Sequence, residues 1–176
     1  MRFVETEIAG AYVVEIEPQA DERGLFARTW CEREFAEHGI AMVMRQCSIS
    51  VNRRRGTMRG MHYQDAPHAE QRLVRCTSGA IFDVIVDLRS ESRSFRRWVG
   101  VELTQENRTM VYVPTGCAHG FLTLVDNVEV FYQMSEFYAA AHASGVRWND
   151  PAFAIDWPGE VNVISERDRN FPDFRP

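Results

Sequence analysis

The chain has 176 residues, a formal net charge of -5 at pH 7 and a sequence pI near 5.6. This charge argues against a general nucleic-acid binder, which presents a net basic face. With 45% hydrophobic and 11% aromatic residues the chain can bury a sizeable core, so disorder is not expected for most of its length.

Targeting and cysteine patterns narrow the class of protein. No apolar run approaches the roughly 20 residues that span a bilayer, and the N-terminus lacks the pattern of a secretion signal. We expect a soluble, cytoplasmic protein with no nucleic-acid or membrane partner. No C-x-x-C pair occurs, which disfavours a zinc site and a disulfide framework among Cys31, Cys47, Cys76 and Cys117. Without repeats or linkers, residues 1–176 are interpreted as one domain.

The predicted elements are mostly short strands. A charged helix is expected over residues 31–38, because good helix formers there stop at a glycine. Residues 80–88 predict a strand that is apolar on both faces and therefore lies between two layers. Further strands are predicted over residues 98–103, 110–113, 120–125 and 129–134, and a last turn of helix from Ser165 onward. Strands interrupted this often indicate an all-β sandwich or barrel.

One strand-like run, Met58–Gln64, contains a histidine among apolar residues. Its alternation predicts that His62 and Gln64 lie on one face and Arg59 on the other. Such a histidine is a candidate base for proton transfer. The alternative is a core histidine that is hydrogen-bonded to a backbone carbonyl.

A second histidine, His119, lies in a glycine-bounded turn between two strand-like segments, and two such histidines suggest one pocket. A metal site is the alternative for a small β barrel. Its usual local signature has two histidines one residue apart with an acid soon after. Neither His62 nor His119 has such a neighbour, so no metal is predicted.

Basic and acidic residues supply the remaining candidates. The run 53–55 (RRR) is typical of a solvated loop, whereas Arg59, Arg72 and Arg75 have apolar neighbours and need an anion to offset desolvation. This pattern favours a phosphate-bearing ligand.

Tyr132 could donate a proton if it faces a cavity, since its ordinary pKa of about 10 keeps it protonated near neutrality, or it could simply pack. Asp168 could fold back from the tail and orient His62, and Asp83 is a rival for that role.

Several motifs together carry a family resemblance. They are DERG (21–24), GTMRGMHYQ (56–64), LVRC (73–76), FDV (82–84), PTGCAHGF (114–121), WNDP (148–151) and DWP (156–158). In their order and spacing the chain resembles the dTDP-4-dehydrorhamnose 3,5-epimerase family over nearly its whole length. The resemblance implies a cupin-type jelly roll, a homodimer, a nucleotide-diphosphate sugar as substrate and no cofactor. It also implies epimerisation at C3, C5 or both of a nucleotide-linked 4-keto-6-deoxyhexose through an enolate.

The same resemblance implies roles for individual residues. His62 matches the base, Asp168 the carboxylate that holds it, and Tyr132 the acid on the opposite face of the sugar. Arg72 stands where the family has a lysine and remains a cation for the enolate oxygen. The positions that match residues for binding the nucleotide diphosphate or lining the site are Arg23, Phe26, Gln46, Arg59 and His119.

The chain departs from the family pattern where the nucleotide should bind. Arg28 replaces a glutamate, residues 46–50 lack an asparagine after the glutamine, and residues 133–137 replace a lysine-bearing run. The identity of the nucleotide and the number of inverted carbons therefore stay open. The alternatives are a single-centre 3- or 5-epimerase, a ketoisomerase on another nucleotide sugar, a non-catalytic nucleotide-sugar binding module, and a metal-dependent cupin oxygenase.

Overall fold

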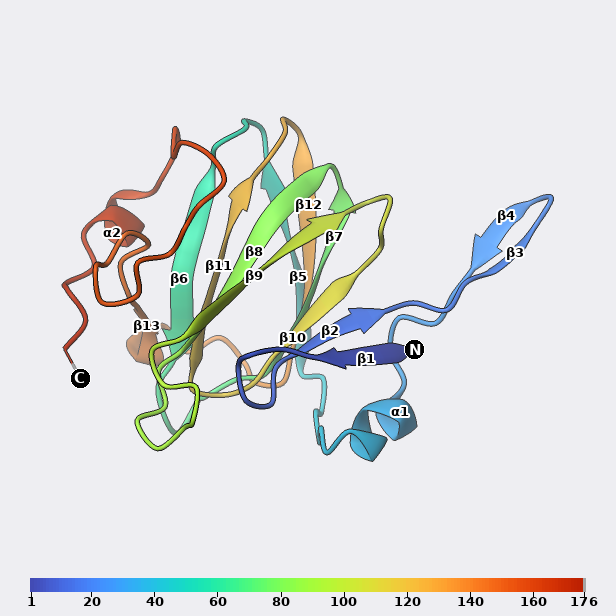
Figure 1. Cartoon of the computed structure of the whole chain (residues 1–176), viewed down its shortest axis with the longest axis horizontal. Helices are drawn as coiled ribbons and strands as arrows, with labels where there is room; N and C mark the ends of the chain where they lie inside the picture. Colours follow the sequence, from blue (N-terminus) through green and yellow to red (C-terminus); the bar gives the residue numbers. More distant parts are fainter. Residues whose placement is uncertain (176) are drawn as a thin grey trace.

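The computed structural model describes residues 1–175 (Figure 1). Two antiparallel sheets face each other. The six-stranded sheet has the order β1 (Arg2–Glu5), β2 (Tyr12–Glu15), β10 (Met110–Val113), β7 (Arg72–Ser78), β12 (Val128–Met134) and β5 (Gln46–Asn52). The five-stranded sheet has the order β13 (Ala143–Gly145), β6 (Met58–Gln64), β11 (Cys117–Thr123), β8 (Ala80–Asp87) and β9 (Trp98–Thr104). This architecture confirms the predicted all-β jelly roll of the cupin type.

Little of the described chain is helical. The short helices are α1 (Glu32–Glu37), the 3-10 turn η1 (Ala140–His142) and α2 (Glu166–Arg169). Both predicted helical segments are confirmed, and α1 is anchored by the buried Phe35. At the start of α2 the side chain of Ser165 accepts a hydrogen bond from the backbone N–H of Asp168. No helix within residues 1–175 is long and apolar enough to cross a membrane.

The core explains why the strand at residues 80–88 is apolar on both faces. Ile81 and Ile85 of β8 face inward and pack with Phe121 of β11 between the two sheets. Val84 and Val86 face outward, where the C-terminal segment covers them with side chains that include Phe153 and Trp157. The prediction that this strand lies between two layers is confirmed, and the second layer is the tail of the chain.

The predicted alternation along β6 is wrong at Arg59. On β11, His119 and Phe121 are two residues apart, whereas their partners on β6, His62 and Arg59, are three apart. The additional residue forms a β-bulge, which shifts the side chains that follow it to the other face. Gly60 occupies the bulge at φ 139°, and a Cβ there would lie 2.6 Å from the Cα of Gly120. The bulge therefore lets Arg59 and His62 line the same cavity.

The predicted start of β11 is also wrong. The glycines around residues 116–120 indicated a turn, but the strand already begins at Cys117. Cys117 and His119 pair with Asp87 and Ile85 of β8, so tertiary pairing overrides the local turn signal. His119 therefore lies within a strand and is held rigidly in the sheet.

A hairpin formed by β3 (Gln19–Asp21) and β4 (Gly24–Phe26) leaves the body of the molecule altogether (Figure 1). Its residues are exposed throughout, including Leu25 at 46% and Phe26 at 77%. A pair of strands is marginal in water unless it packs against another surface. The hairpin therefore presents apolar side chains that nothing in residues 1–175 covers.

Candidate functional site

A cavity of about 560 Å³ lies between the two sheets. β6 and β11 of the five-stranded sheet contribute to it, and so do β5, β7 and β12 of the six-stranded sheet. The lining residues are Gln46, Ser48, Ser50, Arg59, His62, Glu70, Arg72, His119, Tyr132, Met134 and Tyr138. Six of the residues that the sequence singled out line this cavity, although they are spread over the 87 positions from Gln46 to Tyr132.

His62 is paired with Asp168. Nε2 of His62 lies 2.7 Å from Oδ1 of Asp168, and the second carboxylate oxygen accepts from the backbone N–H of Gly60 at 3.2 Å. The imidazole is 36% exposed and the carboxylate 6%. Burial acts to raise the pKa of Asp168, but hydrogen bonds from His62 and Gly60 bring that pKa below its ordinary value. An ionised Asp168 assigns the ring proton to Nε2 and leaves Nδ1 as the nitrogen that can take a proton.

Tyr132 enters the cavity from the opposite sheet. It lies on β12, whereas His62 lies on β6, so the phenol and the imidazole approach from different walls. Burial, reinforced by the charge of Asp83, raises the pKa of Tyr132. The phenol therefore stays protonated at neutral pH and can act as a proton donor.

His119 has a carboxylate partner of its own. Its Nε2 lies 2.8 and 3.0 Å from the two oxygens of Asp83, and both side chains are buried. The ring of His119 also meets the ring of Tyr132 edge-on, with 6.1 Å between centroids. Burial raises the pKa of Asp83, although His119 and then Arg72 oppose that rise. Asp83 thus pairs with His119 and does not compete for His62.

Arg72 bonds to a neighbouring acid and to the backbone of His62. Nε donates to Oε1 of Glu70 at 2.9 Å, Nη2 pairs with the same oxygen, and Nη1 donates to the backbone carbonyl of His62 at 3.2 Å. Both side chains of this ion pair are largely buried. Glu70 was not among the sequence candidates. The requirement that a buried arginine has an anion partner would have found it, because it lies two residues before Arg72.

Arg59 and Gln46 complete the cavity walls. Nε of Arg59 donates to Oδ1 of Asn52 at 2.7 Å, which fixes the guanidinium at the cavity. Oε1 of Gln46 accepts from the backbone N–H of Tyr138 at 3.1 Å. Tyr138, in the loop after β12, is a lining residue as well.

Arg23 and Phe26 are not brought to this cavity. Both lie on the projecting β3–β4 hairpin, where Arg23 is 85% exposed at its side chain and pairs with Asp21 of the same hairpin. Within one chain these two predicted binding residues therefore stand apart from the other seven.

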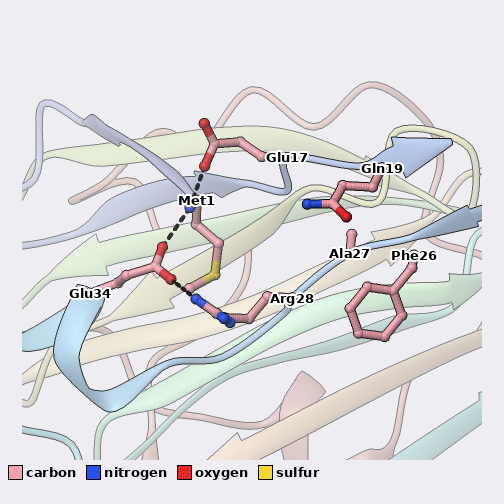
Figure 2. Close-up of a pocket in the computed structure, with 7 residues that line it drawn as sticks. All are labelled: Met1, Glu17, Gln19, Phe26, Ala27, Arg28 and Glu34. Atoms are coloured by element: carbon pink, nitrogen blue, oxygen red, sulfur yellow. Dashed lines mark hydrogen bonds and ion pairs between the residues drawn. The ribbon is translucent and has the colours of Figure 1, made fainter.

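A second pocket, of about 510 Å³, lies at the base of that hairpin (Figure 2). The ammonium group of Met1 bonds to Glu17 at 2.6 Å and to Glu34 at 2.5 Å, and Arg28 donates to Glu34 at 2.6 Å. The ammonium group, and then Arg28, lower the pKa of Glu34. These charges compensate one another, so the pocket ties the hairpin to α1 and offers no uncompensated charge to a ligand.

Within residues 1–175, no three side chains of histidine, cysteine, aspartate or glutamate are grouped so that they could hold a metal ion. The four cysteines are free.

The fold and the cavity define the class of protein: a cupin-type jelly roll with a cavity between its sheets, lined by two histidines that are each paired with an aspartate. Comparison with known proteins then gives the family. The family model for dTDP-4-dehydrorhamnose 3,5-epimerase matches residues 5–176. This chain belongs to that family.

Individual proteins of known name are similar to this chain in sequence and structure, and they point to the same family. A dTDP-4-dehydrorhamnose 3,5-epimerase from Methanothermobacter thermautotrophicus is 42% identical, over 99% of this chain and 95% of the relative. The crystal structure of a Bacillus anthracis dTDP-4-dehydrorhamnose 3,5-epimerase with TDP and PPi bound is 38% identical, with a TM-score of 0.94, over 98% of this chain and 99% of that one. ChmJ, a 3'-monoepimerase from Streptomyces bikiniensis solved with dTDP-quinovose, is 32% identical, with a TM-score of 0.86, over 94% of this chain and 84% of that one.

Proposed function

We propose that this protein epimerises a dTDP-linked 4-keto-6-deoxyhexose at C3 and C5. One observation carries the proposal: a histidine paired with an ionised carboxylate and a protonated tyrosine line the same cavity from opposite sheets. The nucleotide follows from the relatives, among them the Bacillus anthracis enzyme that was solved with TDP.

The proposed chemistry is proton transfer on both faces of the sugar. The 4-keto group acidifies the hydrogens on C3 and C5. Nδ1 of His62 removes one of them, and the electron pair of the C–H bond moves to the carbonyl oxygen as an enolate. The phenol of Tyr132 then returns a proton to the same carbon from the other face, which inverts it. Solvent exchange restores both groups, and no oxidation state changes, so we propose that no cofactor takes part.

Arg72 is proposed to stabilise the enolate. Its guanidinium is fixed by Glu70 and by the carbonyl of His62, so the cation is held beside the base without further reorganisation. Arg59 is proposed to bind the diphosphate, because its Nε is fixed by Asn52 and its terminal nitrogens can form a fork on phosphate oxygens. Gln46 and His119 are proposed to contact the substrate from the walls.

We further propose a cytoplasmic homodimer in which the β3–β4 hairpin reaches the cavity of the partner subunit. Support comes from the exposed Leu25 and Phe26, which need a surface to cover them, and from the anchored base of the hairpin (Figure 2). In that arrangement Arg23 supplies a second cation for the diphosphate, and Phe26 supplies an apolar wall.

Subunit mixing tests this arrangement. An Arg23→Ala chain and a His62→Asn chain are each purified, then unfolded together and refolded as mixed dimers. If the hairpin acts on the partner's site, one site in each mixed dimer has both native residues, and activity rises well above that of either parent. A hairpin that acts within its own chain would leave the mixture no more active than its parents.

Isotope exchange tests the reaction itself. The wild type is incubated with dTDP-4-keto-6-deoxyglucose in heavy water, and NMR follows deuterium at C3 and C5. We expect label at both carbons together with the epimerised product. Tyr132→Phe should retain exchange at a proton that His62 reaches while product formation falls about 10²–10⁴-fold. Unchanged product would exclude tyrosine as the acid.

A single-centre epimerase is the second candidate, favoured by the similarity to the 3'-monoepimerase ChmJ. Label at only one carbon would replace the first proposal with this one. Binding of the substrate without label at either carbon would instead identify a non-catalytic binding module.

A further inference from the structure

The loop that follows β12 is held over the cavity by two glutamine side chains. We call residues Phe137–Ala139 the strap. Nε2 of Gln64 donates to the carbonyl of Phe137 at 3.2 Å, and the N–H of Ala139 donates to Oε1 of Gln64 at 2.7 Å. Between them, the N–H of Tyr138 donates to Gln46 at 3.1 Å. Three consecutive residues are thus fixed through their backbone, whatever their side chains are.

The side chain of Gln64 is buried and fully hydrogen-bonded. It is 4% exposed, and its amide makes a third bond, from Nε2 to the carbonyl of His68 at 3.0 Å. Both amide hydrogens and the carbonyl oxygen are therefore engaged. The bond to His68 ties the strap to the loop of residues 65–70, which ends in the cavity-lining Glu70. Gln64 itself does not line the cavity, so any influence on substrate passes through these loops.

The strap carries one side chain into the cavity. Tyr138 lines it and is nevertheless 62% exposed, which places the ring at the rim. An aromatic ring at the rim offers a flat apolar surface on which a planar ring of a ligand can stack. The affinity gained from stacking is larger when the backbone of the tyrosine is already fixed, because less conformational freedom is then lost on binding. On the other side, Gln46 uses its carbonyl oxygen for the strap and keeps its amide hydrogens for a ligand.

We propose that Gln64 is a positioning residue that sets the affinity for the nucleotide part of the substrate by fixing the strap. This inference rests on the proposed function, since it assumes that the cavity receives a nucleotide sugar. It predicts that weakening the strap raises KM and leaves the proton-transfer step nearly untouched, because His62 and Tyr132 are held by other contacts.

Gln64→Glu tests the proposal. The substitution preserves the shape of the side chain and the acceptor for Ala139, but it removes both hydrogens that are donated to carbonyls. Losing buried hydrogen bonds of this kind should raise KM, and the Kd for dTDP measured by calorimetry, by about tenfold or more, while kcat stays within about threefold. Gln64→Met, which is uncharged and similar in length, should give the same pattern if the glutamate variant does not fold.

Ser94→Ala is the matched control. Ser94 is 1% exposed and bonds to Asp87 and to the backbone of Ala9, away from the residues that line the cavity. We expect it to lower Tm with KM and the dTDP Kd unchanged. A purely structural role for Gln64 would give that same result, a lower Tm alone, and would overturn the proposal. A fall in kcat with unchanged KM would overturn it as well.

A double-mutant cycle with Tyr138→Ala isolates the strap. If Gln64 acts through Tyr138, the Gln64→Met change should raise the dTDP Kd much less in the Tyr138→Ala background than in the wild type. Additive effects would refute the route through the strap. Because the readout is equilibrium binding of dTDP, it remains valid if the wild type shows no turnover, in which case only the proposed reaction fails.

Discussion

The two histidine–aspartate pairs of this protein have nearly the same geometry and opposite surroundings. His62 and His119 face each other across β6 and β11, and their Nε2 atoms lie 2.7 and 2.8 Å from carboxylate oxygens. The first pair is 36% and 6% exposed, and the second 2% and 0%. Burial is the largest influence on both carboxyl groups and raises the pKa of Asp83, whereas at Asp168 the hydrogen bonds and the charge of His62 together outweigh burial and lower the pKa. Both histidines line the cavity, so exposure to solvent, more than the pairing itself, separates the proposed proton-transfer pair from the buried pair.

The element that carries each carboxylate explains why the two histidines differ in exposure. Asp83 lies on β8, directly beside β11, so its pair with His119 forms inside the sheet. Asp168 comes from α2, 106 residues after His62, and reaches β6 from outside. A partner that arrives from outside leaves the histidine at the cavity edge, where its ring can exchange protons.

The largest effect should separate the two histidines. His62→Asn removes the base, and we expect kcat for the epimerisation, measured by NMR, to fall about 10²–10⁴-fold. His119→Asn removes an aromatic ring that packs against Tyr132 and lines the cavity. We therefore expect kcat/KM to fall about tenfold, mostly through a higher KM. If His119→Asn were instead the variant that stops deuterium exchange, the assignment of the two pairs would be reversed.

A smaller effect is expected for the carboxylate that orients His62. Asp168→Asn keeps the size of the side chain but removes the charge that holds the Nε2 proton. We expect kcat to fall about 10–100-fold, as for other orienting groups, with KM nearly unchanged. Circular dichroism and Tm provide the control for folding. A rate equal to that of the wild type would show that the ring is oriented by other contacts.

The smallest effect is on stability, and its sign should differ between the pairs. Since the pKa of Asp168 is lowered, its carboxylate contributes stability that is complete above its ordinary value of 3.8 and is lost as pH falls through the folded value. Since the pKa of Asp83 is raised, the wild type should lose stability relative to Asp83→Asn as pH rises from 3.8 through the folded value.

Urea unfolding between pH 3 and pH 7 measures both trends against the two asparagine variants. Parallel pH trends for Asp83→Asn and Asp168→Asn would contradict the contrast between the pairs.

The strands were predictable from sequence where alternation is strong. The predicted strand at 110–113 coincides with β10, and those at 80–88 and 129–134 differ from β8 and β12 by one residue. The local sequence pattern gave a wrong prediction where pairing with a neighbouring strand sets the backbone conformation, as at the bulge of Gly60 and at the glycine-rich start of β11. Glu70 was missed although its partner Arg72 required an anion, and the strap could not be foreseen because Gln64 meets it 73 residues away.

The pairing of His62 with a residue of α2 has a consequence for biosynthesis. The cavity walls, Tyr132 and both arginines precede Asp168 in the chain, so during synthesis they emerge first and His62 lacks its carboxylate partner until the end. Full activity of the proposed site should therefore appear only once α2 has packed beside β6.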